Sequence, residues 1–317
     1  MPIKVEPQFE FPSFYKPVID VLQNNSSINS IDLFSGRNSG KSYNIYQFVV
    51  INTFAEKDNN VLILRASQAQ IMKSVYTLML NIIEGMGLSM FFRPKRKSMQ
   101  IENIVSGSII YFDGVDDDPE KIKGFTPRNN KISLVIFEEF TELTSDYPIG
   151  VAVETLVRFK GSESNSGNIK FIKMGNPSRW NSHWSWNTIE MDRKNPRCIV
   201  FSPTWKDITG YLEMPTIEYI VNLKLTNERY YKWAYEGQRM SYEGLVYPMF
   251  DESCLADDAD FKDKMYKDQI LTEIPEVDCV VGIGSNENIV ALVKKTLEGN
   301  KVGDFAPKTC LPLTGER

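Results

Sequence analysis

Ser35-Gly36-Arg37-Asn38-Ser39-Gly40-Lys41-Ser42 follows a short, partly apolar stretch and precedes a segment, residues 43–55, whose apolar residues have helical spacing. This layout is typical of a phosphate-binding loop between a buried strand and a helix. Backbone N–H groups of such a loop surround the phosphates, its lysine reaches the β and γ oxygens, and its last hydroxyl is a ligand for Mg²⁺. We therefore predict that residues 35–42 bind ATP and that Ser42 also binds Mg²⁺.

The first position of the loop departs from the usual pattern, because Ser35 stands where glycine is expected. The physical requirement of a phosphate loop is less strict than the sequence pattern, because Gly36 and Gly40 still supply backbone with the necessary conformational freedom. Gly40-Lys41-Ser42 is intact. A Ser/Gly-rich turn before a helix is the alternative interpretation. The partner motif further along the chain favours the nucleotide site.

That partner motif is Leu134-Val135-Ile136-Phe137 followed by Glu138 and Glu139. An apolar strand of this kind presents its acidic residues at the carboxyl edge of the sheet, beside the phosphate loop. We predict that Glu138 holds Mg²⁺ and that Glu139 orients and deprotonates the water that attacks the γ-phosphate. Many enzymes of this type have Asp at the first acidic position, so Glu138 is a second departure. The alternative is an apolar strand that runs into a charged loop.

Three further candidates are the end of another predicted strand and two arginines, one of them inside the phosphate loop. Gly175-Asn176-Pro177 ends another predicted strand, and we expect it to couple the γ-phosphate to the following segment, although a simple turn is the alternative. Arg37 and Arg65 are candidates for stabilising transition-state charge, because a guanidinium is planar and permanently charged. Arg37 is favoured, and either arginine is alternatively a surface ion-pair partner.

Strands alternate with helices around the glycine-rich loop, which indicates an α/β fold of the P-loop NTPase (RecA/ASCE-like) kind with a mostly parallel sheet. Residues 1–27 carry aromatic and proline residues, among them Phe14 and Tyr15. We interpret them as a hydrophobic flap on the core, with stacking on adenine as the alternative. The expected strands are 28–34, 61–64, 90–92, 100–104, 108–112, 134–137 and 169–174, and the expected helices are 43–55, 71–86 and 214–242.

The chain has 317 residues, of which 42% are hydrophobic, so its length predicts about two domains with a sizeable core. We predict a motor domain over residues 1–250 and a linker over the acidic, irregular residues 251–275. Residues 276–317 then begin a second domain with a β-hairpin formed by 277–283 and 289–293.

Composition excludes several function classes. A net charge of −5 argues against a small basic nucleic-acid binder, but not against an enzyme that holds DNA through one patch or inside a ring. Four scattered cysteines and one histidine make a zinc site or a disulfide framework improbable. No apolar run approaches the ~20 residues that span a bilayer. We predict a soluble intracellular protein with no membrane contact.

Taken together, the motifs resemble the large subunit of phage terminases, the motors that move viral DNA into capsids. The resemblance covers roughly residues 25–255 in one order. Besides the ATP motifs, it includes Leu62 to Arg65, Ser74 to Tyr76, Gly107 to Gly114, Lys121 to Gly124, Phe137 to Leu143, His183-Trp184, Tyr235 to Gly237 and Glu243 to Pro248.

The resemblance implies an ATP-hydrolysing translocase of double-stranded DNA in the host cytoplasm, docked transiently on the procapsid. It also implies a portal protein and a terminase small subunit as partners, and a homo-oligomeric ring, in this family a pentamer. Arg93 to Lys97 and the Lys121/Lys123 pair are candidates for phosphate contacts with DNA, with solvated charged turns as the alternative.

Family members carry a C-terminal RNase H-like nuclease whose first strand usually ends Gly-Ile-Asp. Here Gly282-Ile283 is followed by Gly284, and Glu287 falls in the predicted turn. We therefore expect a truncated start of that domain without nuclease activity, and an irregular tail over residues 303–317.

Two other functions remain open at this point. One is a helicase-like or recombination ATPase with a similar core. The other is an inactive relic that acts only in assembly, an interpretation that Ser35 and Glu138 keep open.

Overall fold

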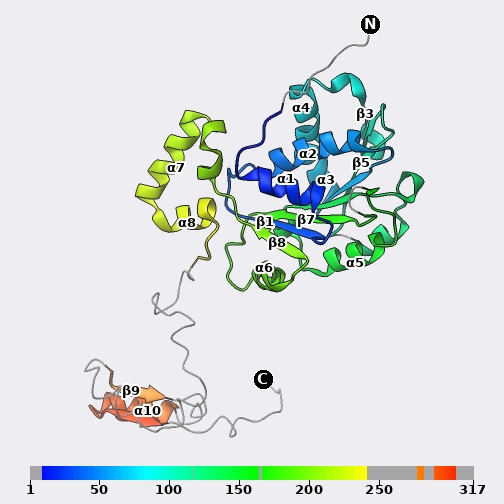
Figure 1. The fold of residues 1–317 in the computed structure, drawn as a ribbon. Helices are drawn as coiled ribbons and strands as arrows, with labels where there is room; N and C mark the ends of the chain where they lie inside the picture. Colours follow the sequence, from blue (N-terminus) through cyan, green and yellow to red (C-terminus); the bar gives the residue numbers. More distant parts are fainter. Residues whose placement is uncertain (1–8, 117, 164–165, 241–276, 282–288, 305–317) are drawn as a thin grey trace. The chain divides into compact units, whose positions relative to one another are not determined.

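The computed structural model describes residues 9–116, 118–163, 166–240, 277–281 and 289–304. The chain divides into two units, residues 1–243 and 244–317, and each is described by itself. The first unit is built around an eight-stranded sheet with helices on both faces (Figure 1).

The sheet has the strand order β3-β4-β5-β2-β6-β7-β1-β8. The six strands from β5 to β8 in this order are parallel, and β3 and β4 add an antiparallel edge. This confirms the predicted mostly parallel α/β fold. The strands are β1 Ser30–Phe34, β2 Val61–Arg65, β3 Phe92–Lys95, β4 Gln100–Asn103, β5 Ile109–Gly114, β6 Leu134–Glu138, β7 Lys170–Gly175 and β8 Cys198–Phe201.

Two hydrophobic layers cover the two faces of the sheet, because successive side chains of a strand point to opposite faces. Val61 and Ile63 of β2 pack with α1, α2 and α4, whereas Leu62 and Leu64 pack with α5 and α6. The α-helices are α1 Tyr15–Asn24, α2 Lys41–Ala55, α3 Gln68–Ile71, α4 Thr77–Gly85, α5 Tyr147–Leu156, α6 Trp184–Lys194, α7 Met214–Thr226 and α8 Glu228–Glu236. A π-helical turn, Met72–Tyr76, joins α3 to α4. Short 3₁₀ helices span Ser89–Phe91, Arg96–Ser98, Pro119–Gly124, Arg128–Asn130, Phe140–Glu142 and Trp205–Tyr211.

The described part of the N-terminal segment packs on the core and contains a helix that the sequence analysis did not predict. Tyr15, the first residue of α1, is fully buried in the core, and its hydroxyl donates to the backbone oxygen of Ser39 at 2.8 Å. Phe14 packs edge-on against Phe201 of β8. Both rings therefore belong to the core. The sequence analysis also did not predict the edge strand β8.

The second unit corrects the prediction of a β-hairpin. Ile289–Leu297 forms helix α10, between the parallel strands β9, Cys279–Val281, and β10, Val302–Asp304. The physical reason is that parallel strands need a crossover connection, and the apolar residues of 289–297 recur at helical spacing. The predicted tail therefore begins with two strand residues, 303 and 304. The predicted linker, Gly284 and Glu287 lie outside the described residues.

Within the described parts of the chain, none of the helices combines the length and the apolar character that crossing a bilayer requires.

Candidate active site

The phosphate loop, residues 35–40, connects β1 to α2 as predicted. Left-handed backbone occurs at Asn38, with φ 53°, and at Gly40, with φ 78°, whereas Ser35 does not need it. The Ser35 and Ser39 hydroxyls lie 3.0 Å apart across the base of the loop. A glycine at position 35 is therefore not required by the backbone, and serine adds a hydrogen bond that closes the loop.

Lys41 is buried inside the loop. Its Nζ lies within hydrogen-bonding distance of the Ser35 and Gly36 backbone oxygens, at 3.1 and 2.9 Å, and of Asn176 Oδ1, at 2.9 Å. Burial lowers the pKa of Lys41 to about 8, although Glu139 and Glu138 oppose this shift. The ammonium group is thus held by oxygen atoms at the place where a phosphate would supply stronger acceptors.

Glu138, the first acidic residue of the second motif, forms a hydrogen bond with Ser42 of the loop motif. The Ser42 hydroxyl donates to Glu138 Oε1 at 2.7 Å. This hydrogen bond joins two residues that are 96 positions apart in the chain. Burial, followed by the neighbouring Glu139, raises the pKa of Glu138 to about 7. Oε2 of Glu138 is buried and has no hydrogen-bond partner among the described residues.

This donor set fits Mg²⁺. Magnesium prefers oxygen ligands and often takes one or two carboxylates beside substrate phosphates. A hydroxyl and a buried carboxylate with a spare oxygen meet that requirement, and a cation here would also compensate the buried negative charge.

The backbone of Glu139 explains how two consecutive residues serve one site. Glu139 has φ 48° and ψ 46°, which is left-handed and uncommon outside glycine. Neighbouring residues of a regular strand point to opposite faces, and the left-handed residue ends that alternation. Glu139 consequently lines the cavity while Glu138 stays buried beside Ser42. Uncommon backbone of this kind is often found at functional sites.

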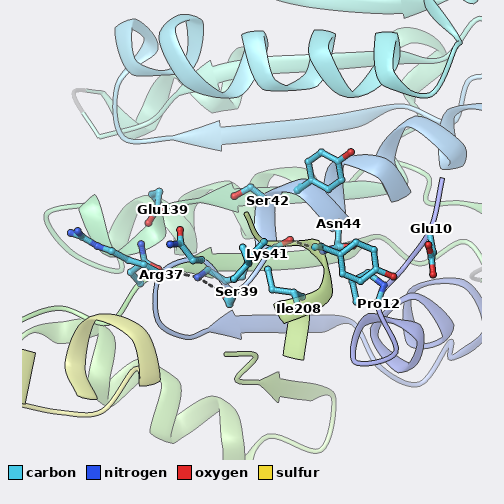
Figure 2. Close-up of a pocket in the computed structure, with 15 residues that line it drawn as sticks. Glu10, Pro12, Arg37, Ser39, Lys41, Ser42, Asn44, Glu139 and Ile208 are labelled. Atoms are coloured by element: carbon cyan, nitrogen blue, oxygen red, sulfur yellow. Dashed lines mark hydrogen bonds between the residues drawn. The ribbon is translucent and has the colours of Figure 1, made fainter. Parts of the chain in front are cut away.

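The cavity itself has a volume of about 620 Å³, which is in the range of small-molecule sites. Figure 2 shows Arg37 and Glu139 toward one end, Lys41 and Ser42 in the middle, and Pro12 and Glu10 toward the other. Its lining comprises Glu10, Pro12, residues 37–44, Glu139, Asn176, Ile208, Tyr211 and Leu212.

Besides Tyr43 and Asn44, which directly follow the loop on α2, five lining residues were missed by the sequence analysis: Glu10, Pro12, Ile208, Tyr211 and Leu212. They carry no motif and reach the cavity from segments that precede β1 or follow β8. Their types suit an organic base, since three are apolar and Tyr211 offers a ring face. No periodicity in the sequence marks them.

Gly175-Asn176-Pro177 lies at the end of β7, next to the phosphate loop, as predicted. Asn176 accepts a hydrogen bond from Lys41, and the Gly175 backbone oxygen accepts one from the Ser35 N–H at 3.3 Å. The Pro177 oxygen accepts one from the Trp233 indole N–H at 3.0 Å. The segment thus touches the loop on one side and α8 on the other.

Helix α8 packs against the phosphate loop through backbone atoms. The Arg37 N–H donates to the Ala234 oxygen at 2.6 Å. A Cβ on Gly36 would lie 2.4 Å from the Tyr235 carbonyl carbon, so only glycine fits there. Gly36 is therefore fixed by a tertiary contact and not by the backbone freedom for which it was singled out.

The two candidate arginines differ in position. Arg37 lines the cavity, and its guanidinium lies 5.9 Å from the Trp233 ring centroid. Arg65 is paired with the Glu142 carboxylate at 2.9 Å and donates to the Ser74 hydroxyl at 2.6 Å, and it does not line the cavity. The structure thus brings Arg37, but not Arg65, to the cavity.

The basic candidates for DNA contact lie away from the cavity, and several are paired. Lys121 lies 2.9 Å from Asp113, and Lys123 forms an ion pair with Glu120. Within the run 93–97, at the edge of the sheet, Lys95 lies 2.8 Å from Glu102. The remaining cations of this run, Arg93, Arg96 and Lys97, are exposed.

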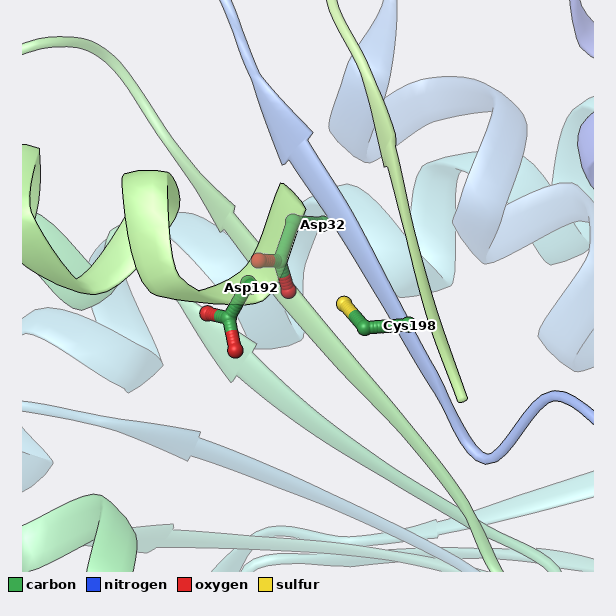
Figure 3. Close-up of side chains that lie close together, drawn as sticks. All are labelled: Asp32, Asp192 and Cys198. Carbon is green, nitrogen blue, oxygen red and sulfur yellow. The ribbon is translucent and has the colours of Figure 1, made fainter. Parts of the chain in front are cut away.

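A mostly buried ion network connects β1, β7 and α6. Asp32 of β1 is fully buried, is in register with Lys173 of β7, and has its Oδ2 3.3 Å from the Lys173 ammonium, which also pairs with Asp192 of α6. Figure 3 shows Asp32, Asp192 and Cys198 of β8 gathered between α6 and the sheet. Ligand atoms of these three residues lie within 4.8 Å of one another. Lys173 already supplies the positive charge that a metal ion would bring, so we interpret the group as an ion network.

Asp32→Asn is expected to change how stability depends on pH. Burial raises the pKa of Asp32 from 3.8 to about 7, so between these values the folded chain holds a proton that the unfolded chain has released. Stability therefore falls as pH rises through this window, by on the order of a few kcal/mol, and the amide removes this contribution. Urea unfolding from pH 4 to 8 should show the variant gaining stability over the parent as pH rises. The exposed Asp20→Asn is the control, and equal slopes for all three proteins would contradict the assignment.

Comparisons with known proteins agree with this geometry. The family model described as phage terminase large subunit matches residues 29–238. No curated protein sequence matches significantly.

Three solved structures share the fold. The large terminase of the thermophilic bacteriophage D6E has a TM-score of 0.57 at 16% identity, over 77% of this chain and 57% of that one. The HK97 bacteriophage large terminase has a TM-score of 0.55 at 12% identity, over 75% and 52%. The Thermus phage P74-26 large terminase ATPase domain has a TM-score of 0.50 at 15% identity, over 74% and 100%.

This chain spans a little over half the length of the D6E and HK97 proteins that it matches, and all of the P74-26 ATPase domain is covered. The D6E protein is also known in complexes with ATP-gamma-S and with ADP. Since the family model matches about two thirds of the sequence, the chain belongs to the phage terminase large-subunit family.

Proposed function

We propose that this chain is the ATP-hydrolysing motor that moves double-stranded viral DNA into a procapsid, and that residues 1–250 form its motor domain. One observation carries the proposal. The Ser42 hydroxyl and the Glu138 carboxylate meet at 2.7 Å, at a cavity that Lys41 and Glu139 also line. Family membership and the nucleotide complexes of the D6E protein support the same assignment.

Each residue of the site has a role in the proposed reaction. Backbone N–H groups of residues 38–42 and the Lys41 ammonium bind the phosphates. Ser42 and Glu138 would hold Mg²⁺, which neutralises charge on the phosphate oxygens when bound. Glu139 orients the attacking water and accepts its proton, and Arg37 stabilises the charge of the transition state.

The coupling segment connects this chemistry to the rest of the unit. Asn176 contacts Lys41, so a γ-phosphate that draws the ammonium away removes one of the hydrogen bonds of Asn176. The Pro177 backbone oxygen accepts a hydrogen bond from the indole of Trp233 in α8. The ring of Trp233 also lies near the guanidinium of Arg37, in the loop. We propose that this route transmits the state of the nucleotide to α7 and α8.

The proposed partners follow from family membership. They are double-stranded DNA, a portal protein, a terminase small subunit and further copies of the chain in a ring on the procapsid, in the host cytoplasm. Contacts to DNA phosphates carry no sequence information, which suits a motor. Among the basic candidates, the exposed cations of run 93–97 are freer to contact phosphates than Lys121 and Lys123, which are already paired.

ATPase activity measured without DNA, with linear double-stranded DNA and with single-stranded DNA tests the proposal. We expect slow hydrolysis by the isolated chain and clear stimulation by double-stranded DNA. The stimulation should decrease between ~50 and ~200 mM salt, because phosphate contacts release counterions. Stimulation by single strands alone would indicate a helicase-like ATPase, and absence of ATP hydrolysis under all three conditions would indicate an inactive relic.

A further inference from the structure

Tyr46 is a buried tyrosine whose hydroxyl has no assigned partner. It lies one helical turn after Ser42 on α2, so the two side chains share a face of that helix. Tyr46 is fully buried, and no hydrogen-bond partner for its hydroxyl is found among the described residues. Most buried hydroxyl groups in proteins are hydrogen-bonded, so this one requires an explanation.

A matching acceptor faces this hydroxyl. Glu138 Oε2 is equally buried and equally without a hydrogen bond in the described part of the chain. Burial raises the pKa of the Tyr46 hydroxyl, and the neighbouring Glu138 raises it further. A donor and an acceptor therefore lie near each other in the buried part of the site, in contact but not in a well-formed hydrogen bond, while the Ser42 hydroxyl donates to the other carboxylate oxygen.

Packing alone does not account for a tyrosine at this position. The ring belongs to the hydrophobic layer that α2 forms with the sheet. Phenylalanine would fill the same space without burying an unsatisfied hydroxyl, which is unfavourable. A buried hydroxyl without a full hydrogen bond is unfavourable, and a role at the neighbouring Glu138 carboxylate would explain its presence.

We propose that Tyr46 is a positioning residue for Glu138: its hydroxyl donates to Oε2 and would hold the carboxylate in orientation when Ser42 and Glu138 hold Mg²⁺. The inference rests on the proposed function, since it presupposes a magnesium–nucleotide complex at this site. Hydrogen bonds of this kind orient ligating carboxylates in metal sites generally.

Tyr46→Phe removes one oxygen atom and keeps the ring. Binding of a fluorescent ADP analogue is measured at equilibrium in EDTA and across a Mg²⁺ titration. The Mg²⁺ concentration that gives half of the magnesium-dependent gain in affinity should rise about 10–100-fold, the usual effect of losing such a hydrogen bond. Affinity in EDTA should not change, and the Tm of the nucleotide-free protein should not fall.

Tyr76→Phe is the matched control. Tyr76 is also a buried tyrosine, but its hydroxyl donates to the Gln100 oxygen at 3.3 Å, on a strand outside the cavity lining. This variant should leave both affinities unchanged.

Two results would overturn the inference. Equal weakening with and without Mg²⁺ would show that Tyr46 acts through packing, and an unchanged Mg²⁺ titration would show that the hydroxyl has no role. If the parent protein binds no nucleotide under either condition, the proposed function itself fails, which is a distinguishable outcome.

Discussion

Replacing Glu139 by glutamine is expected to lower the rate of ATP hydrolysis by about 10²–10⁴-fold, the usual contribution of a general base. The amide keeps the size of the side chain and its left-handed backbone position, but it cannot accept the proton of the attacking water. Binding of ATP should change little, because the phosphates are held by the loop and by Lys41. The expected signature is a protein that binds ATP and does not turn it over.

Single-turnover hydrolysis and equilibrium binding of ATP, measured on the same preparation, separate these two effects. Glu154→Gln is the control, since Glu154 is an exposed residue of α5 that does not line the cavity. Lys41→Ala is the contrasting variant, because loss of the ammonium should weaken binding as well as hydrolysis. Hydrolysis by Glu139→Gln at the parental rate would show that another group accepts the proton.

Gly36→Ala is expected to disrupt the phosphate loop and its contact with α8 together. The added Cβ would lie 2.4 and 2.5 Å from the Tyr235 carbonyl carbon and oxygen, and both are backbone atoms that cannot rotate away. The hydrogen bond from the Arg37 N–H to the Ala234 oxygen must then lengthen or break. Overpacking of this kind costs about 1–3 kcal/mol. We expect a lower Tm and a clear loss of nucleotide affinity.

Gly150→Ala provides a control, for which the expected change in stability has the opposite sign. Gly150 lies inside α5, where an added Cβ meets no atom within 4 Å, so alanine should stabilise the helix by about 1 kcal/mol. Thermal unfolding of the two variants beside the parent tests the prediction. If Gly36→Ala unfolds at the parental temperature and binds nucleotide normally, α8 does not pack on the loop as described.

The sequence predicted the local elements of the sheet well. Runs such as Val61 to Leu64 and Leu134 to Phe137 are apolar throughout, which is typical of strands buried on both faces. It missed β8, whose side chains are only partly buried apart from Cys198. It also missed α1, where proline and aromatic residues suggested a hydrophobic flap without a helix, although Tyr15, Val18, Ile19 and Leu22 form one buried helical face.

The hairpin error in the second unit has a related cause. A short apolar run such as 289–293 fits a strand and a helix equally well when only a few residues are considered. Pairing between β9 and β10 decides the matter, since two parallel strands this close in sequence need a crossover. Information about the partner strand is not contained in the run itself.

The amino-acid sequence by itself determined the chemical inventory of the site: a glycine-rich loop with Lys41 and Ser42, and an apolar strand ending in two carboxylates. Short-range rules suffice for this, because strand burial, helix spacing and loop backbone depend on neighbouring residues. The tertiary structure alone decided that Gly36 is required by α8, that Arg37 rather than Arg65 lines the cavity, and that Ile208 and Tyr211 also line it. These facts depend on contacts between segments far apart in the sequence, such as Gly36 with Tyr235 and Arg65 with Glu142, whose packing no local pattern encodes.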